Sequence, residues 1–113
     1  MCDKNHALEI FKEACSLMES IFPNVNKAYL YGSYARGDYH NESDIDILFV
    51  VPLSWEEINA KRSDYCSIAG KLSLENDITV SITIKPKSIF DKWKDSLPFY
   101  MNVVKEGVLH EYR

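Results

Sequence analysis

The chain is poor in the residues that build disulfide-linked or metal-linked scaffolds. Its three cysteines, Cys2, Cys15 and Cys66, are odd in number and widely spaced along 113 residues. This pattern predicts neither a disulfide framework nor a cysteine metal cluster, and it favours a reducing, intracellular compartment, so we expect a cytoplasmic protein. Internal repeats, low-complexity tracts and recognisable linkers are also absent from the sequence.

Long hydrophobic runs and an excess of positive charge are missing as well. No segment approaches the roughly 20 apolar residues of a membrane span, and residues 1–6 are polar, without the apolar stretch of a signal peptide. The formal net charge of −4 and a pI near 5.3 argue against stable nucleic-acid binding through a basic surface. A catalytic visit by a nucleic-acid end remains open.

What the sequence does contain is enough apolar material for one folded domain. Hydrophobic residues make up 46% of the chain and aromatic residues 12%, which suffices for a core. A length of 113 residues suits one compact unit and leaves little room for a second. We therefore expect a single domain over residues 1–113.

Hydrophobic periodicity predicts alternating helices and strands. We expect helices over 6–22, from Ser54 to about Ser73, over 88–93 and over 99–106, with Ser54 and Glu57 forming a capping box and Ser88 capping its helix. We expect strands over 27–31, 45–51 and 77–85, and a short edge strand over 108–112. This order indicates an α/β or α+β fold in which helices flank a small, mixed β-sheet.

The most informative segment begins directly after the first predicted strand, at Gly32 and Ser33. A glycine-serine turn lets backbone N–H groups approach a phosphate without interference from a Cβ atom. Ser33 stands where a helix N-cap is expected, and it would hold a β- or γ-phosphate through its hydroxyl and N–H groups. Arg36 follows one turn later and could pair with a phosphate through two hydrogen bonds.

Two aspartates, Asp44 and Asp46, open the second predicted strand ten residues further on. Side chains at i and i+2 of a strand point to the same face, so this pair can share hard divalent cations. A two-metal site needs a further carboxylate from a neighbouring strand, beside the attacking hydroxyl. Asp77 is the first candidate because it opens the third predicted strand, and Glu75 is the alternative.

At these residues the chain resembles the DNA polymerase β-type nucleotidyltransferases, and more narrowly their minimal nucleotidyltransferase (MNT) branch. The family pattern is a Gly-Ser pair, about ten residues, then Asp-x-Asp, with another Asp on a later strand. Gly32, Ser33, Asp44 and Asp46 match it directly, and Asp77 matches by order. The segments 35–37 and 97–108 also look like this branch, and the resemblance covers nearly the whole chain.

The resemblance implies the nucleotidyltransferase fold and transfer of a nucleoside monophosphate, most often AMP from ATP, to an acceptor hydroxyl. It implies that Asp44, Asp46 and Asp77 bind two Mg²⁺ ions and that Asp77 also activates the acceptor. It further implies ATP or another nucleoside triphosphate as substrate. Many small MNT proteins are antitoxins that add AMP to a tyrosine of a helical HEPN partner.

Two other functions remain open from the sequence. The chain could be a binding module that neutralises a partner by masking it, because no acceptor-binding domain is present. Modification of a small molecule such as an antibiotic is less favoured, because 113 residues offer little structure to enclose such an acceptor.

Overall fold

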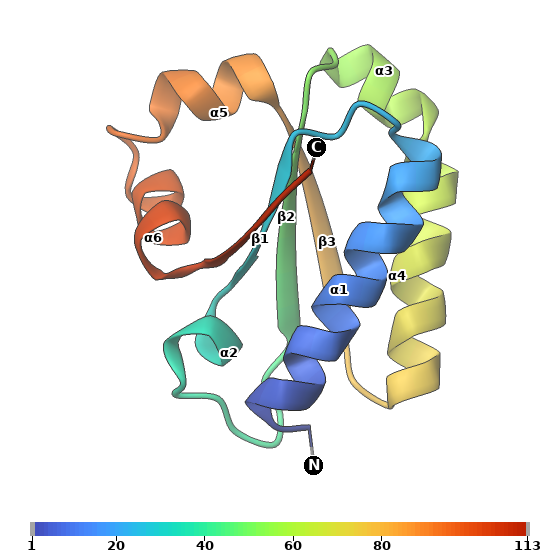
Figure 1. Ribbon diagram of the computed structural model, residues 1–113, viewed down its shortest axis with the longest axis vertical. Coiled ribbons are helices and arrows are strands. Elements are labelled where there is room, and N and C mark those ends of the chain that lie inside the picture. The colour runs from blue at the N-terminus through green and yellow to red at the C-terminus, as the bar shows by residue number, and fades with distance from the viewer. Residues whose placement is uncertain (1, 113) are drawn as a thin grey trace.

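A four-stranded sheet lies between two layers of helices in the computed structural model, which describes residues 2–112 (Figure 1). The elements in chain order are α1 (Lys4–Ile21), β1 (Lys27–Tyr31), α2 (Ser33–Arg36), β2 (Ile45–Val51), α3 (Trp55–Ala60), α4 (Arg62–Asn76), β3 (Val80–Pro86), α5 (Lys87–Trp93), α6 (Pro98–Glu106) and β4 (Val108–Glu111). The predicted α/β architecture of a sheet flanked by helices is confirmed.

The sheet is mixed, as predicted, with strand order β3-β2-β1-β4. β1 pairs antiparallel with both β2 and β4, whereas β2 and β3 run parallel. The bounds of β1 and β2 agree with the sequence prediction residue for residue. Both strands are central in the sheet and covered on both faces. A continuous apolar run therefore marks each strand in the sequence, and turn residues mark its ends.

Each face of the sheet has its own hydrophobic cluster. Helices α1 and α4 cover one face, where Ile47 and Phe49 of β2 point, and α5 and α6 cover the other, where Leu48 and Val50 point (Figure 1). Side chains alternate between faces along a strand. Asp46 therefore faces the α5–α6 side, at the end of the sheet where β2 begins.

The observed helix boundaries and caps agree with the sequence prediction at some positions and differ from it at others. The capping box at Ser54 and Glu57 is present with both of its hydrogen bonds. The single helix expected from Ser54 to Ser73 is instead two, divided at Lys61, which is the C-cap of α3 and the N-cap of α4. Ser88 makes no capping hydrogen bond. Helix α5 begins one residue earlier, at Lys87, after Pro86.

Two expectations about composition can be compared with the structure. The three cysteines are free thiols; Cys15 is buried in the core, and Cys66 is exposed on α4. Within residues 2–112, no helix combines the length and the apolar character needed to span a bilayer.

Candidate active site

The turn after β1 places a glycine, whose backbone is not covered by a side chain, at the end of the sheet. Gly32 has φ +79° and precedes α2, and Gly37 closes that short helix with φ +93°. Both conformations are strained for residues that carry a Cβ atom. Gly32, rather than the expected Ser33, is the N-cap, so Ser33 is the first helical residue and its N–H group has no partner within the helix.

Asp46 lies directly against this turn. It pairs with Tyr31 across β1 and β2, and its Oδ2 atom would be 2.7 Å from a Cβ atom placed on Gly32. Asp44 lies two residues earlier, where the strand begins, and is exposed, whereas Asp46 is half-buried. The structure thus brings Gly32, Asp46 and Asp44 together at one end of the sheet, with Ser33 next in the chain.

The Asp44 carboxylate is close enough to Asp46 to influence its pKa. Burial is the main cause that raises the pKa of Asp46, and the nearby Asp44 carboxylate raises it further. The Arg36 guanidinium opposes this shift. Arg36 itself is exposed and forms an ion pair with Asp38, with Nε and Oδ2 3.3 Å apart. The Arg36 guanidinium is therefore close enough to Asp46 to lower the pKa of that carboxyl group, and it is exposed enough to bind an anionic ligand.

A pocket of about 230 Å³ opens beside the glycine turn. Tyr31, Gly32 and Arg36 line one side of it, and residues of α6, including Phe99 and Val103, line the other. The Tyr31 and Phe99 rings meet edge to face at 5.6 Å. The sequence prediction did not name these aromatic residues for the site; the only signal was the resemblance of the segment that includes Phe99.

Asp77 lies elsewhere, because the third strand begins later than expected. It is the C-cap of α4, with φ +51°, and β3 starts at Val80. Asp77 lines a separate polar pocket of about 480 Å³ together with Cys2, His6 and Tyr34, among others. Aspartate tolerates the left-handed conformation better than most residues, and the structure uses it here to leave the helix.

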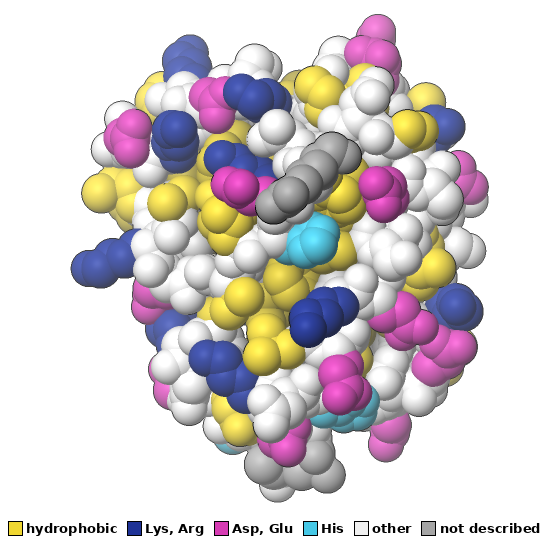
Figure 2. All heavy atoms as spheres, viewed as in Figure 1, with side chains coloured by type: hydrophobic (Ala, Val, Ile, Leu, Met, Phe, Trp, Pro, Cys, Tyr) yellow, Lys and Arg dark blue, Asp and Glu magenta, His cyan; other side chains and the backbone are white. Residues whose placement is uncertain are grey.

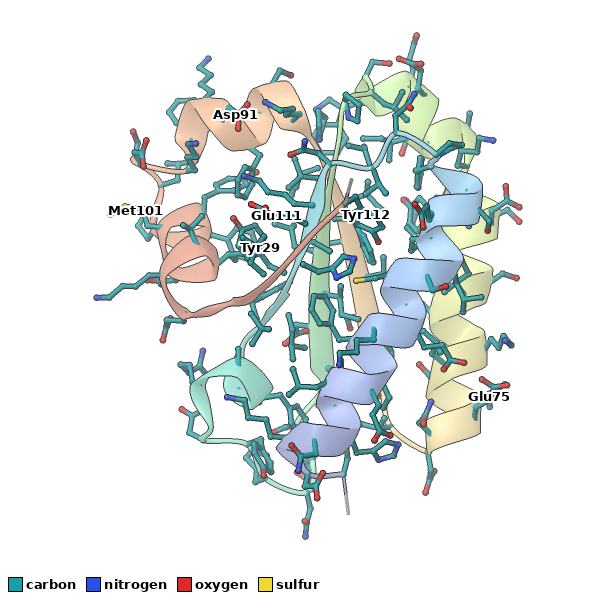
Figure 3. The ribbon with its side chains drawn as sticks, in the orientation of Figure 1. Tyr29, Glu75, Asp91, Met101, Glu111 and Tyr112 are labelled. Carbon is teal, nitrogen blue, oxygen red and sulfur yellow. The ribbon has the colours of Figure 1, made fainter. Side chains whose placement is uncertain are left out.

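Glu75, the alternative, is also remote from the aspartate pair. It lies on α4, is exposed and comes within 4.0 Å of Lys71. Figure 3 shows its side chain directed outward, away from the sheet. In the part of the chain that the structure describes, no three His, Cys, Asp or Glu side chains converge into a group able to hold a metal ion. The expected three-carboxylate group is therefore not assembled.

The residues that do converge fit one hard divalent cation bound together with a phosphate ligand. Mg²⁺ is commonly held by one or two carboxylates plus substrate phosphates, with water completing the octahedron. Asp44 and Asp46 supply the two carboxylates on one face, and their mutual repulsion, seen in the pKa of Asp46, is the kind that a cation relieves. The N–H group of Ser33, which has no partner within α2, follows Gly32 directly in the chain.

Comparison with known proteins agrees with this geometry. Residues 8–109 match the family described as the nucleotidyltransferase domain. The chain belongs to this family. The match includes the glycine turn, both aspartates and α6, so the resemblance inferred from the sequence is confirmed. This nucleotidyltransferase is 37% identical over 83 residues to "Putative protein adenylyltransferase MJ0604" of Methanocaldococcus jannaschii, covering 74% of the chain and 75% of that relative.

A second relative from the same organism, "Putative protein adenylyltransferase MJ0141", is 35% identical over 94 residues, with 82% of this chain and 93% of the relative covered. Among solved structures, one described as a "putative nucleotidyltransferase from Sulfolobus solfataricus" superimposes with a TM-score of 0.59 at 27% identity, covering 94% of this chain and 80% of that one. A toxin–antitoxin structure with AMP-PNP gives 0.55 at 24% identity, with coverage of 87% and 69%. The likeness to the toxin–antitoxin structure, at 24% identity, shows only that the fold is shared.

Proposed function

We propose that this nucleotidyltransferase transfers AMP from ATP, with Mg²⁺, to a tyrosine hydroxyl of a helical, HEPN-type partner protein. The observation that carries the proposal is the position of Asp46, which is packed against Gly32 and coupled to Asp44. Such a site can hold a cation against a triphosphate that is bound to the backbone of the turn.

Each residue of the site has a distinct part in this proposal. Asp44 and Asp46 would hold the cation, which neutralises charge on the transferring phosphate when it is bound. The N–H groups at Gly32 and Ser33, with the Ser33 hydroxyl, would bind phosphate oxygens. Arg36 would exchange its exposed ion pair with Asp38 for a phosphate, a change that costs little because surface ion pairs are weak.

The choice of a protein acceptor is supported by the relatives and by the surface beside the site. Both archaeal relatives are named protein adenylyltransferases. A structural neighbour is described as a tri-AMPylated Shewanella oneidensis HEPN toxin in complex with MNT antitoxin; it has a TM-score of 0.51, 20% identity, and coverage of 91% and 70%.

Helix α6 and its N-cap residue, Leu97, carry an exposed apolar stripe made of Leu97, Met101 and Val104, at spacings of four and three residues and each 40–45% exposed. Figure 2 shows hydrophobic side chains at the surface in this region, and Figure 3 shows Met101 directed outward from α6. The adjacent side of the same helix contributes Tyr100 and Val103 to the core. A helix whose apolar surface extends beyond its buried side is typical of one that a partner covers.

The transfer is tested by incubating the protein with ATP labelled at the α-phosphate, Mg²⁺ and a purified HEPN-type protein. We expect label on the partner, and loss of at least 100-fold in rate for the double change Asp44→Asn with Asp46→Asn. Glu42→Gln is the matched control, because this exposed acid lies in the preceding loop. No label, with transfer seen for a related enzyme in parallel, would refute the proposal.

Masking without catalysis is the second candidate, and the apolar stripe on α6 is the observation that favours it. The two functions separate in one experiment. If Asp44→Asn with Asp46→Asn still neutralises the partner, masking alone suffices. If the double variant binds the partner but no longer neutralises it, transfer is required.

A further inference from the structure

The strand beside Asp46 carries a hydroxyl where a two-metal site requires a carboxylate. In the parallel pairing of β2 with β3, Asp46 lies opposite Ser81 and Leu48 lies opposite Thr83. Residues paired across neighbouring strands share a face of the sheet, so the Ser81 side chain lies on the same side as the Asp46 carboxylate. The other neighbour of Asp46, across β1, is Tyr31.

None of the acids anticipated from the sequence fills this position. Asp77 is four residues before Ser81, outside β3, and lines a pocket on the α1 side; Glu75 is an exposed residue of α4. The positions of the acids agree with this: within residues 2–112, no three His, Cys, Asp or Glu side chains are grouped so that they could hold a metal ion.

We infer that Ser81 limits this enzyme to one divalent cation per bound nucleotide. The inference deepens the proposed function and rests on it. Two carboxylates with phosphate oxygens can complete one Mg²⁺ coordination shell. A second cation beside the attacking hydroxyl would need its own anionic ligand, and a neutral serine hydroxyl supplies no charge to hold it.

This assignment has a consequence for the transfer step. The acceptor oxygen forms a bond to the α-phosphorus, the bond from the α-phosphorus to the oxygen that bridges it to the β-phosphate breaks, and pyrophosphate leaves. The acceptor proton goes to water, because neither a third carboxylate nor a second cation is present to take it or to lower its pKa. A carboxylate at position 81 should therefore accelerate transfer, which is unusual for a substitution inside an active site.

The experiment counts Mn²⁺ ions by electron paramagnetic resonance at saturating α,β-methylene ATP, an analogue that cannot be cleaved at the α–β position. We expect one Mn²⁺ per protein–nucleotide complex for the natural protein and two for Ser81→Asp. The matched controls are Thr83→Asp, which adds the same charge two residues along the same face, and Ser81→Asn, which adds similar volume without charge. Both should retain one ion.

Asp77→Asn distinguishes the two positions directly, and we expect it to leave the ion count at one and nucleotide affinity within about twofold. Two ions on the natural protein would overturn the inference without requiring any variant to fold. A lower count in Asp77→Asn, or a single ion in a folded, nucleotide-bound Ser81→Asp, would overturn it as well. These outcomes leave the proposed function standing, whereas failure of the natural protein to bind the analogue with Mn²⁺ would remove both.

Discussion

Oδ2 of Asp46 lies so close to Gly32 that a methyl group on that glycine would meet it at 2.7 Å. The contact joins the glycine turn to the start of β2, and it predicts the effect of adding the smallest possible side chain at Gly32. Gly32→Ala should lower the unfolding free energy by about 1–3 kcal/mol, because φ is +79° there. It should also displace the Asp46 carboxylate and weaken binding of Mn²⁺ with the ATP analogue at least tenfold.

Gly37→Ala is the control for that change. Gly37 also has a positive φ, +93°, but a Cβ atom there would have no neighbour within 4 Å. We expect it to cost stability in urea unfolding and to leave cation and nucleotide binding unchanged. Equal binding losses in the two variants would show that backbone strain, rather than the contact with Asp46, is what matters.

Asp46→Asn should make the metal-free protein more stable near neutral pH. Burial and the Asp44 charge raise the pKa of Asp46 in the folded state, so the folded protein binds this proton more tightly than the unfolded chain does. The natural protein therefore loses stability as pH rises from the ordinary aspartate value, about 3.9, through the folded value. Asparagine has no such dependence.

Urea unfolding without divalent cations, at pH 7 and at about pH 4, measures this difference. The advantage of Asp46→Asn should be present at pH 7 and should shrink toward zero at the lower pH. Glu42→Gln, which removes an exposed charge in the preceding loop, should show neither effect. A less stable Asp46→Asn at pH 7 would mean that the carboxylate stabilises the fold, and that its repulsion with Asp44 is not the dominant interaction.

The parts of the site that could be predicted from the sequence are those determined by neighbouring residues. Gly32 and Asp46 each stand at the end of an apolar strand, and the sequence places both strands correctly. Period-two alternation then puts Asp44 and Asp46 on one face without any knowledge of the tertiary structure. The antiparallel pairing of β1 with β2 completes the arrangement.

The third position could not be predicted, because it depends on where a helix ends. The sequence predicts that the helix ends near Ser73 and that the strand begins at residue 77. Instead α4 continues to Asn76, whose side-chain Nδ2 donates to the Leu72 carbonyl. Asp77 then turns the chain in the left-handed conformation. These capping contacts shift β3 so that it begins at Val80, and the register with β2 selects Ser81.

Ser73 joins this helix end to β3, and its removal should be costly. Its hydroxyl donates to the Ala69 carbonyl at 2.7 Å and accepts from the Val80 N–H at 2.9 Å. Ser73→Ala leaves the N–H of a buried residue without this partner, which should lower the unfolding free energy by about 1–3 kcal/mol. Faster hydrogen exchange at Val80 would locate the effect.

Ser20→Ala is the matched change, since the Ser20 hydroxyl makes a similar bond of 2.7 Å to the Leu17 carbonyl but on an exposed helix surface. It should alter the unfolding free energy by no more than about 0.5 kcal/mol. If the two serine variants were equally stable, the start of β3 would not depend on Ser73.

Met101→Asp tests whether the apolar stripe on α6 is the docking surface for the proposed partner. The side chain is 45% exposed and points away from the core, so the fold and the binding of the ATP analogue should be unchanged (Figure 3). Affinity for the partner should fall at least tenfold, equivalent to about 1.4 kcal/mol or more, because a charge in a buried apolar contact is left unpaired. The label transferred to the partner should fall in parallel.

Leu74→Asp is the control, because Leu74 is 87% exposed and lies on α4, which covers the opposite face of the sheet. Equal losses for both variants would indicate a general effect of surface charge, and no loss for Met101→Asp would place the partner on another surface.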